Sequence, residues 1–140
     1  MILLDTNVIS EAMKPLPDGQ VVDWMNATAS NLMFVSTITI AEVHFGLELL
    51  PDGRRRTDLE RRFEQFLSRG FDQRIVAFDA PAARVYGALM AHRQRAGMPL
   101  ASLDGQIAAI AQVHGFAVAT RNTDHFADCG VELVNPFAAS

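Results

Sequence analysis

Short apolar runs alternate with longer amphipathic segments along the whole of this sequence. The apolar runs are too short for helices and predict buried strands. The segments between them carry apolar residues at helical spacing, as at Ile40, Val43 and Leu47. Strands separated by helices favour a mostly parallel α/β sheet of four to five strands with right-handed crossovers and helices on both faces. The expected strands cover residues 1–4, 32–35, 75–78, 116–119 and 131–134, and the expected helices cover residues 8–13, 20–27, 39–50, 58–68, 79 or 81–95, and 102–114.

The length and composition fit one domain over residues 1–140. A chain of 140 residues can bury about two thirds of its unfolded surface in a single core. A hydrophobic fraction of 49% with 20% charged residues is typical of a soluble globular protein, and no apolar run approaches the roughly 18 residues of a membrane span. The sequence begins with an apolar run that ends at Asp5, not with a secretory signal, and Cys129 is the one cysteine. We therefore expect a cytoplasmic protein without disulfides or a cysteine zinc site.

The arginines are unevenly distributed. A net charge of −4 argues weakly against a protein that coats nucleic acid, because such binding depends on lysine and arginine neutralising phosphates. Five of the arginines nevertheless fall within residues 54–56 and 61–62, which indicates a locally positive surface. The alternative is a solvated helical face with pairs such as Asp58 to Arg62 at i,i+4.

Four acidic residues stand where strands end or where helices begin. Asp5 follows the first strand, Glu42 lies in the helix after the second strand, Asp104 lies in the first turn of the helix before the fourth strand, and Asp124 follows the fourth strand. In open α/β sheets, ligands bind beyond the carboxyl ends of the strands. We therefore expect these acids to face one crevice.

Each acid also has an ordinary structural explanation. Thr39 and Glu42 have the spacing of a capping box. Asp104 could oppose the dipole of its helix, Asp5 could cap the helix that follows it, and Asp124 could close an Asx-turn.

Several carboxylates at one crevice would repel one another and raise each other's pKa unless a cation joins them. Oxygen ligands without cysteine or paired histidines suit Mg²⁺ or Mn²⁺ better than zinc. His44 and His125 lack the spacing of a metalloprotease motif, and we interpret both as structural. A metal with open positions can polarise a phosphoryl oxygen and activate water, which predicts phosphodiester hydrolysis.

The acids occur within motifs that are found together in a known family. Residues 1–7 (MILLDTN), 40–42 (IAE), 102–104 (SLD), 119–122 (ATRN) and 134–137 (VNPF) follow one another in the order and spacing of that family's motifs. Over its whole length the chain resembles PIN-domain ribonucleases, specifically the VapC-type toxins of bacterial toxin–antitoxin pairs. The resemblance implies a magnesium-dependent endoribonuclease.

The resemblance also assigns roles to residues. It implies that Asp5 and Asp104 are the main metal ligands and that Glu42 completes the site. The hydroxyls of Thr6 and Thr120 are expected to hold the carboxylates in place.

The sequence departs from the family pattern at one point. The family often has a further acid directly after the Thr-Arg pair, where this chain has the neutral Asn122, and Asp124 lies two residues further on. Either residue could supply the fourth position of the site. The departure leaves open whether one or two Mg²⁺ ions bind, and one is expected.

The resemblance further implies partners: an RNA substrate, a second copy of the chain in a homodimer, and a small antitoxin of the VapB or FitA kind. An arginine of the antitoxin could enter the acidic site and form bidentate bonds with carboxylates. The helix pair over residues 39–68 offers Phe45, Leu49, Phe63 and Phe66 as apolar surface for an antitoxin tail, although core packing is an alternative role for them.

Two other classes of function remain open from the residues alone. A phosphotransfer protein would also carry an aspartate at a strand end, but a phosphatase of that kind needs a second aspartate where this chain has Asn7, and a receiver domain needs a late lysine where Lys14 is the one lysine. A non-catalytic binding module with the same fold is the other alternative.

Overall fold

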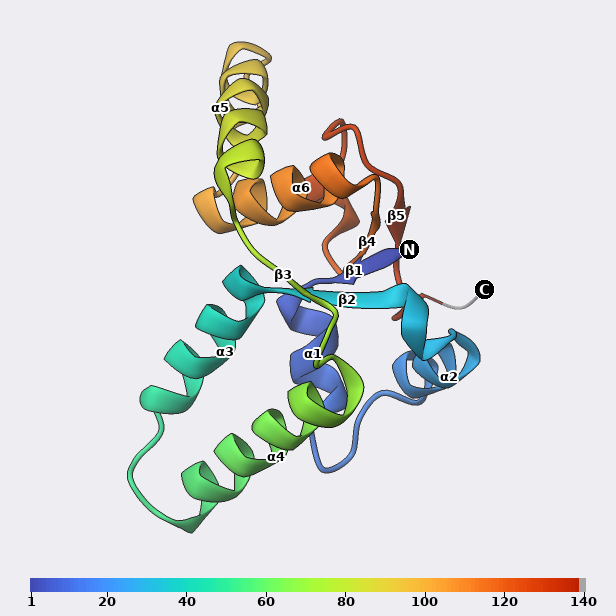
Figure 1. Ribbon diagram of the computed structural model, residues 1–140, viewed down its shortest axis with the longest axis vertical. Coiled ribbons are helices and arrows are strands. Elements are labelled where there is room, and N and C mark those ends of the chain that lie inside the picture. The colour runs from blue at the N-terminus through green and yellow to red at the C-terminus, as the bar shows by residue number, and fades with distance from the viewer. Residues whose placement is uncertain (139–140) are drawn as a thin grey trace.

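A five-stranded parallel sheet lies at the centre of the computed structural model, which describes residues 1–138 (Figure 1). The strands lie in the order β3-β2-β1-β4-β5, and every neighbouring pair is parallel, so the first strand of the chain is the central one. The predicted α/β fold is confirmed. The strands are β1 (Ile2–Leu4), β2 (Met33–Ser36), β3 (Ile75–Val76), β4 (Ala117–Ala119) and β5 (Leu133–Val134).

Helices cover both faces of this sheet. In Figure 1, α5 and α6 lie on one side of the strands and α1 to α4 on the other. No helix within residues 1–138 is long and apolar enough to cross a membrane. The helices are α1 (Thr6–Ala12), α2 (Gly19–Ala27), α3 (Thr37–Glu48), α4 (Arg54–Gly70), α5 (Ala80–Arg95) and α6 (Ser102–His114), with short 3₁₀ turns η1 (Ser30–Leu32) and η2 (Thr123–Phe126).

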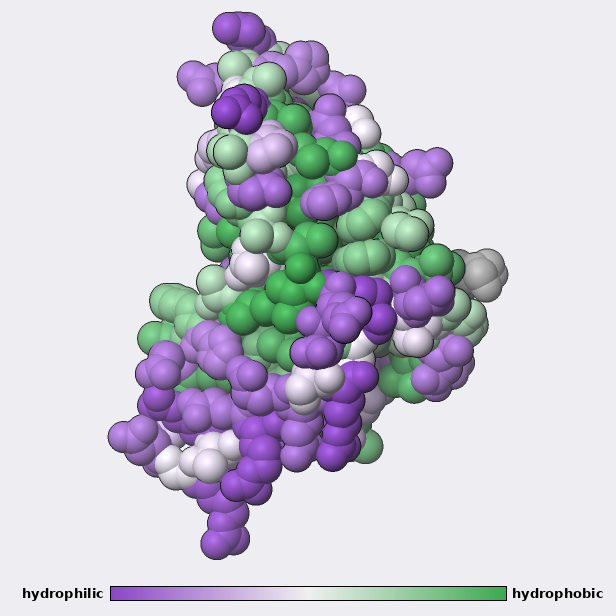
Figure 2. Space-filling model, viewed as in Figure 1, coloured by the Kyte–Doolittle hydropathy of each residue, from purple (hydrophilic) through white to green (hydrophobic). Residues whose placement is uncertain are grey.

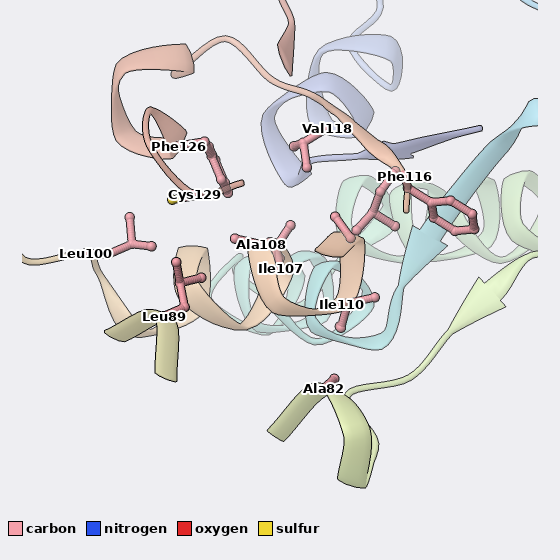
Figure 3. Packing of buried hydrophobic residues seen from close by; sticks show 12 residues of the cluster. Ala82, Leu89, Leu100, Ile107, Ala108, Ile110, Phe116, Val118, Phe126 and Cys129 are labelled. Carbon is pink, nitrogen blue, oxygen red and sulfur yellow. The ribbon is translucent and has the colours of Figure 1, made fainter. Parts of the chain in front are cut away.

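Alternation along the strands divides the core between the two faces. Leu3 and Val118 pack with α5 and α6, whereas their neighbours Leu4 and Ala119 pack with the helices on the opposite face. Successive side chains of a strand point to opposite faces, so strands covered on both faces are apolar throughout. Figure 3 shows the hydrophobic cluster on the side of α5 and α6. Ile107 of α6 belongs to it together with Val118 of β4, Leu89 of α5 and Cys129 after η2.

The structure corrects several expected boundaries. α3 begins at Thr37, with Ser36 as its N-cap, and not at residue 39. α4 begins at Arg54, directly after Gly53, whose φ of 151° favours glycine, so Arg54–Arg56 form part of the helix. β3 and β5 are two residues long where four were expected. The expected end of the sixth helix is confirmed, because Gly115 takes the left-handed conformation there.

Candidate active site

Asp5 is the most firmly held acid at the carboxyl edge of the sheet. It follows the central strand β1, and its side chain also caps α1 by accepting a 2.8 Å hydrogen bond from the Thr6 amide. The capping role that the sequence allowed is therefore real, but it uses only Oδ1. Oδ2 accepts hydrogen bonds from Thr120 Oγ1 at 2.8 Å and from Asn7 Nδ2 at 3.2 Å. The register of β1 with β4 places Leu4 opposite Ala119, which brings Asp5 and Thr120 together.

Burial makes the charged form of Asp5 costly. The residue is 4% exposed, and burial raises the pKa of its carboxyl group above the ordinary value. The hydrogen bonds from Thr120 and Thr6 lower this pKa, and the negative charges of Asp104 and Glu42 raise it again. Hydrogen-bond donors thus fix the orientation of Asp5, while the nearby acids repel its negative charge.

Glu42 is oriented by the residue that follows Asp5. Its Oε1 accepts a 2.9 Å hydrogen bond from Thr6 Oγ1, and the same hydroxyl lies 3.1 Å from Thr39 Oγ1. The capping-box explanation is wrong, because Ser36 caps α3 by accepting from the Thr39 amide at 3.1 Å. Glu42 therefore does not cap α3, and its hydrogen bond with Thr6 holds it near Asp5.

Asp104 lies in the first turn of α6, close enough to Asp5 for its charge to raise the pKa of that carboxyl group. Its side chain is 26% exposed and lies 3.6 Å from His125 Nδ1, measured at Oδ2. Its neighbour Gly105 allows α6 to lie close to α5, since a Cβ atom there would come within 2.5 Å of Met90 Sδ. A side chain at position 105 would therefore require Met90 to move.

The loop after β4 carries the remaining predicted residues. The Asn122 amide donates a 3.0 Å hydrogen bond to Thr120 Oγ1, so the loop is fixed to the hydroxyl that also holds Asp5. Asp124 lies in η2 and is exposed, and its side chain forms no hydrogen bond or ion pair within residues 1–138. The structure therefore brings Glu42 and Asp104 close enough to Asp5 to raise its pKa, whereas Asp124 makes no side-chain contact with these acids within residues 1–138.

The donor set fits a hard divalent cation with few protein ligands. No group of three histidine, cysteine or acidic side chains in the described part of the chain lies close enough to hold a metal on its own. Mg²⁺ usually keeps several waters and binds through one or two carboxylates, so a tight three-residue cage is not required. A cation at Asp5 would offset the cost of burying its negative charge and the repulsion from Asp104 and Glu42.

Sequence reasoning did not identify two supporting residues. Asn7 bridges both sides of the crevice edge, because its Nδ2 donates to Asp5 and to Thr120 while its Oδ1 accepts from the Arg121 amide at 3.1 Å. Glu11, which is buried in α1, accepts hydrogen bonds from Lys14, from the Asp18 amide and from Arg121. The position of Asn7, two residues after the strand-end acid, was a usable signal, but Glu11 offered none.

Comparison with known proteins gives a consistent family. The family model described as "PIN domain" matches residues 2–131. The VapC ribonuclease Y4jK of Sinorhizobium fredii is 43% identical over 137 residues, covering 98% of each chain. The toxin FitB of Neisseria gonorrhoeae is 40% identical over 137 residues, covering 98% of this chain and 99% of its own.

Solved structures agree with these relatives. The structure described as FitAB bound to an IR36 DNA fragment superposes with a TM-score of 0.94 at 39% identity, covering 100% of this chain and 98% of the matched chain. The similarity therefore extends over the whole sheet and all of the helices around it.

Proposed function

The chain belongs to the PIN-domain family, and we propose that it is an endoribonuclease toxin of a toxin–antitoxin pair that hydrolyses RNA phosphodiester bonds with a bound metal. We also propose that residues 1–140 form this one domain. The observation that carries the proposal is the group of Asp5, Glu42 and Asp104 at the carboxyl edge of a parallel sheet, in a chain 43% identical to a VapC ribonuclease.

The ribonucleases of this family are metal-dependent, and we propose Mg²⁺ for this chain, with Mn²⁺ as a substitute. Asp5 and Asp104 would hold the ion and Glu42 would complete the site. When bound, the ion polarises a phosphoryl oxygen and activates a water for in-line attack. Either Asn122 or Asp124 would supply a fourth polar group.

The residues of the chain itself prepare this site before any substrate arrives. Thr120 and the Thr6 amide fix both oxygens of Asp5, so its carboxylate does not need to reorganise when a cation approaches. The Thr6 hydroxyl turns Glu42 toward the same edge.

Two partners belong to the proposal. A small antitoxin would cover the site and could place an arginine among the carboxylates. Phe45 on α3 and Leu49 at its C-cap are 59% and 72% exposed and offer apolar surface for its tail. Phe66 is half-buried, and Phe63 is fully buried and belongs to the core. The second partner is another copy of the chain, in a homodimer. We also propose a cytoplasmic location, because the RNA substrate and an antitoxin made beside the toxin would be found there.

Cleavage of a total RNA pool tests this function. Purified protein should give discrete fragments with Mg²⁺ and none with EDTA. Asp5→Asn should lower the rate by at least about a hundredfold, because losing a metal carboxylate removes several kcal/mol of transition-state stabilisation at roughly 1.4 kcal/mol per decade.

Asp23→Asn is the matched control, since Asp23 is an exposed acid on α2 with no ion pair within residues 1–138, and it should cleave like the wild type. Equal cleavage by the wild type and Asp5→Asn would mean that the activity came from a contaminant, and the non-catalytic alternative would take its place.

A further inference from the structure

A groove lined by arginines opens beside the proposed site. It lies between α1, α3 and α4 and has a volume of about 620 Å³. Glu42 forms part of its lining, together with Lys14 of the α1–α2 connection and the α4 residues Arg54, Arg55 and Arg62. A proposed catalytic acid and a row of cations therefore share one depression of the surface, which we call the arginine groove.

The structure separates the clustered arginines of α4 into different roles. Arg56 forms ion pairs with Glu48, Asp52 and Glu60 at 2.5 to 3.0 Å, and so fixes the connection between α3 and α4. Arg61 is exposed but does not line the groove.

The three arginines of the groove are exposed and form no ion pair within the described residues. The pair between Asp58 and Arg62 that helical spacing predicted is absent from this part of the chain. Figure 2 shows that hydrophilic side chains dominate the surface over α4.

The chemistry of the groove suits a nucleic-acid strand. The whole chain carries a net charge of −4, yet here four cations face only two acids, Glu42 and Asp58. RNA carries one negative charge per nucleotide, and phosphate contacts with arginine and lysine supply essentially all of the free energy of non-specific binding. Lys14 is already paired with Glu11 at 2.9 Å, which leaves the three arginines as the free cations.

On the basis of the ribonuclease function proposed above, we propose that the arginine groove binds the single-stranded RNA on one side of the scissile phosphate. Arg54, Arg55 and Arg62 contact successive phosphates as the strand leaves the site past Glu42. The apolar floor, with Met13, Val43 and Leu59, contacts the faces of the bases. Aliphatic contacts of this kind do not select a base, so the groove contributes affinity and the direction of the strand.

Charge removal with a matched control tests this assignment. The groove variant combines Arg54→Gln, Arg55→Gln and Arg62→Gln. The control variant combines Arg61→Gln, Arg84→Gln and Arg95→Gln, which changes the net charge equally at exposed arginines outside the groove. Binding of labelled polyuridine is measured against salt concentration in an Asp5→Asn background, where the strand is not cleaved.

The groove variant should bind more weakly, and its slope of log K against log salt should be smaller by about two, because each phosphate contact on a single strand contributes roughly 0.7. In the background with Asp5 intact, the KM for long RNA should rise about tenfold at unchanged kcat, since the lost contacts bind substrate and transition state equally. The control variant should keep the slope and the KM of the wild type.

Equal slopes for the two variants would overturn the inference. So would a groove variant that cleaves RNA normally but escapes inhibition by an antitoxin peptide, because the groove would then be a protein-binding site. If the wild type shows no metal-dependent cleavage, the ribonuclease function itself fails, and that outcome is distinct from either result.

Discussion

Asp5 and Asp104 lie close enough for the charge of Asp104 to raise the pKa of Asp5, but the two side chains are held in different ways. Asp5 is 4% exposed, and its two oxygens accept three hydrogen bonds, from the Thr6 amide, the Thr120 hydroxyl and the Asn7 side chain. Asp104 has 26% of its side chain exposed, and within residues 1–138 its side chain makes one polar contact, 3.6 Å from a ring nitrogen of His125. One half of the site is organised by strand ends and threonine hydroxyls, and the other half by a helix terminus.

This difference suggests a division of labour between the two halves. Asp5 is fixed before a cation arrives, whereas Asp104 keeps the freedom to adjust to the cation and its waters. Mg²⁺ demands nearly octahedral geometry, and a site with one rigid and one adjustable carboxylate can satisfy that demand. Substitutions can perturb the two halves separately.

The largest effect is expected from Asp104→Asn. Cleavage should fall by about a hundredfold, because the proposed metal would lose one of its two carboxylate ligands. In EDTA, however, the melting temperature should not fall, since the substitution removes a negative charge that opposes the ionisation of Asp5. Melting curves with and without Mg²⁺ check this: the metal should raise the melting temperature of the wild type and not of the variant. A drop in stability in EDTA would mean that Asp104 serves the fold and not the metal.

Arg93 supports the adjustable half, and its replacement should lower the free energy of unfolding by about 2 kcal/mol. The buried side chain of Arg93 donates hydrogen bonds to the backbone carbonyls of Met98, His125 and Ala127, which joins the end of α5 to the segment that carries His125. Arg93→Met would leave those carbonyls without their cationic donor. Denaturant unfolding measures the loss, and Arg95→Met is the control, because Arg95 is an exposed residue of the same helix. An unchanged midpoint for Arg93→Met would show that the segment is held by other contacts.

A smaller effect is expected when the fixed half is loosened. Thr120→Val removes a hydroxyl that donates to Asp5 and accepts from the Asn122 amide. Residues that orient a metal ligand typically contribute a factor of ten or more, so kcat/KM at limiting Mg²⁺ should fall roughly tenfold. Thr123→Val changes a threonine in the other half, in η2, and should have little effect. Similar losses in the two variants would contradict the proposed difference between the halves.

The positions of Asp5 at the end of β1 and of Asp104 in the first turn of α6 could both be predicted, and the reasons are local. A buried strand that ends on an acid is encoded in adjacent residues, so the position of Asp5 at the central strand and the family motifs around it could be identified directly. The role of Glu42 was ambiguous, because Ser36 and Thr39 are both acceptable caps and only the fold selects Ser36. The start of α4 was placed too late, because three successive arginines give no apolar periodicity.

Contacts between distant segments could not be predicted at all. Arg93 and Ala127 are 34 residues apart, and Arg121 and Glu11 are 110 residues apart. No spacing rule connects such pairs, because their proximity depends on how the helices pack against the sheet. The same limit applies to the arginine groove, whose three elements meet only in the folded chain.

The smallest effect concerns a second buried acid, and its sign is opposite to that of Asp5. Hydrogen bonds from Lys14 and the Asp18 amide, with the charges of Lys14 and Arg121, hold the pKa of Glu11 below its ordinary value of 4.5. A lowered folded-state pKa stabilises the fold at pH values above 4.5, and this stabilisation is lost as the pH falls through the folded-state pKa. Asp5, with its raised pKa, makes the metal-free fold less stable as the pH rises above 3.8. Glu11→Gln should therefore be less stable than the wild type at neutral pH, and the difference should shrink as the solution is acidified below pH 4.5. Urea unfolding in EDTA at a series of pH values measures the difference. A gap between the two proteins that stays constant through the acidic range would mean that Glu11 stabilises the fold by packing and not by its charge.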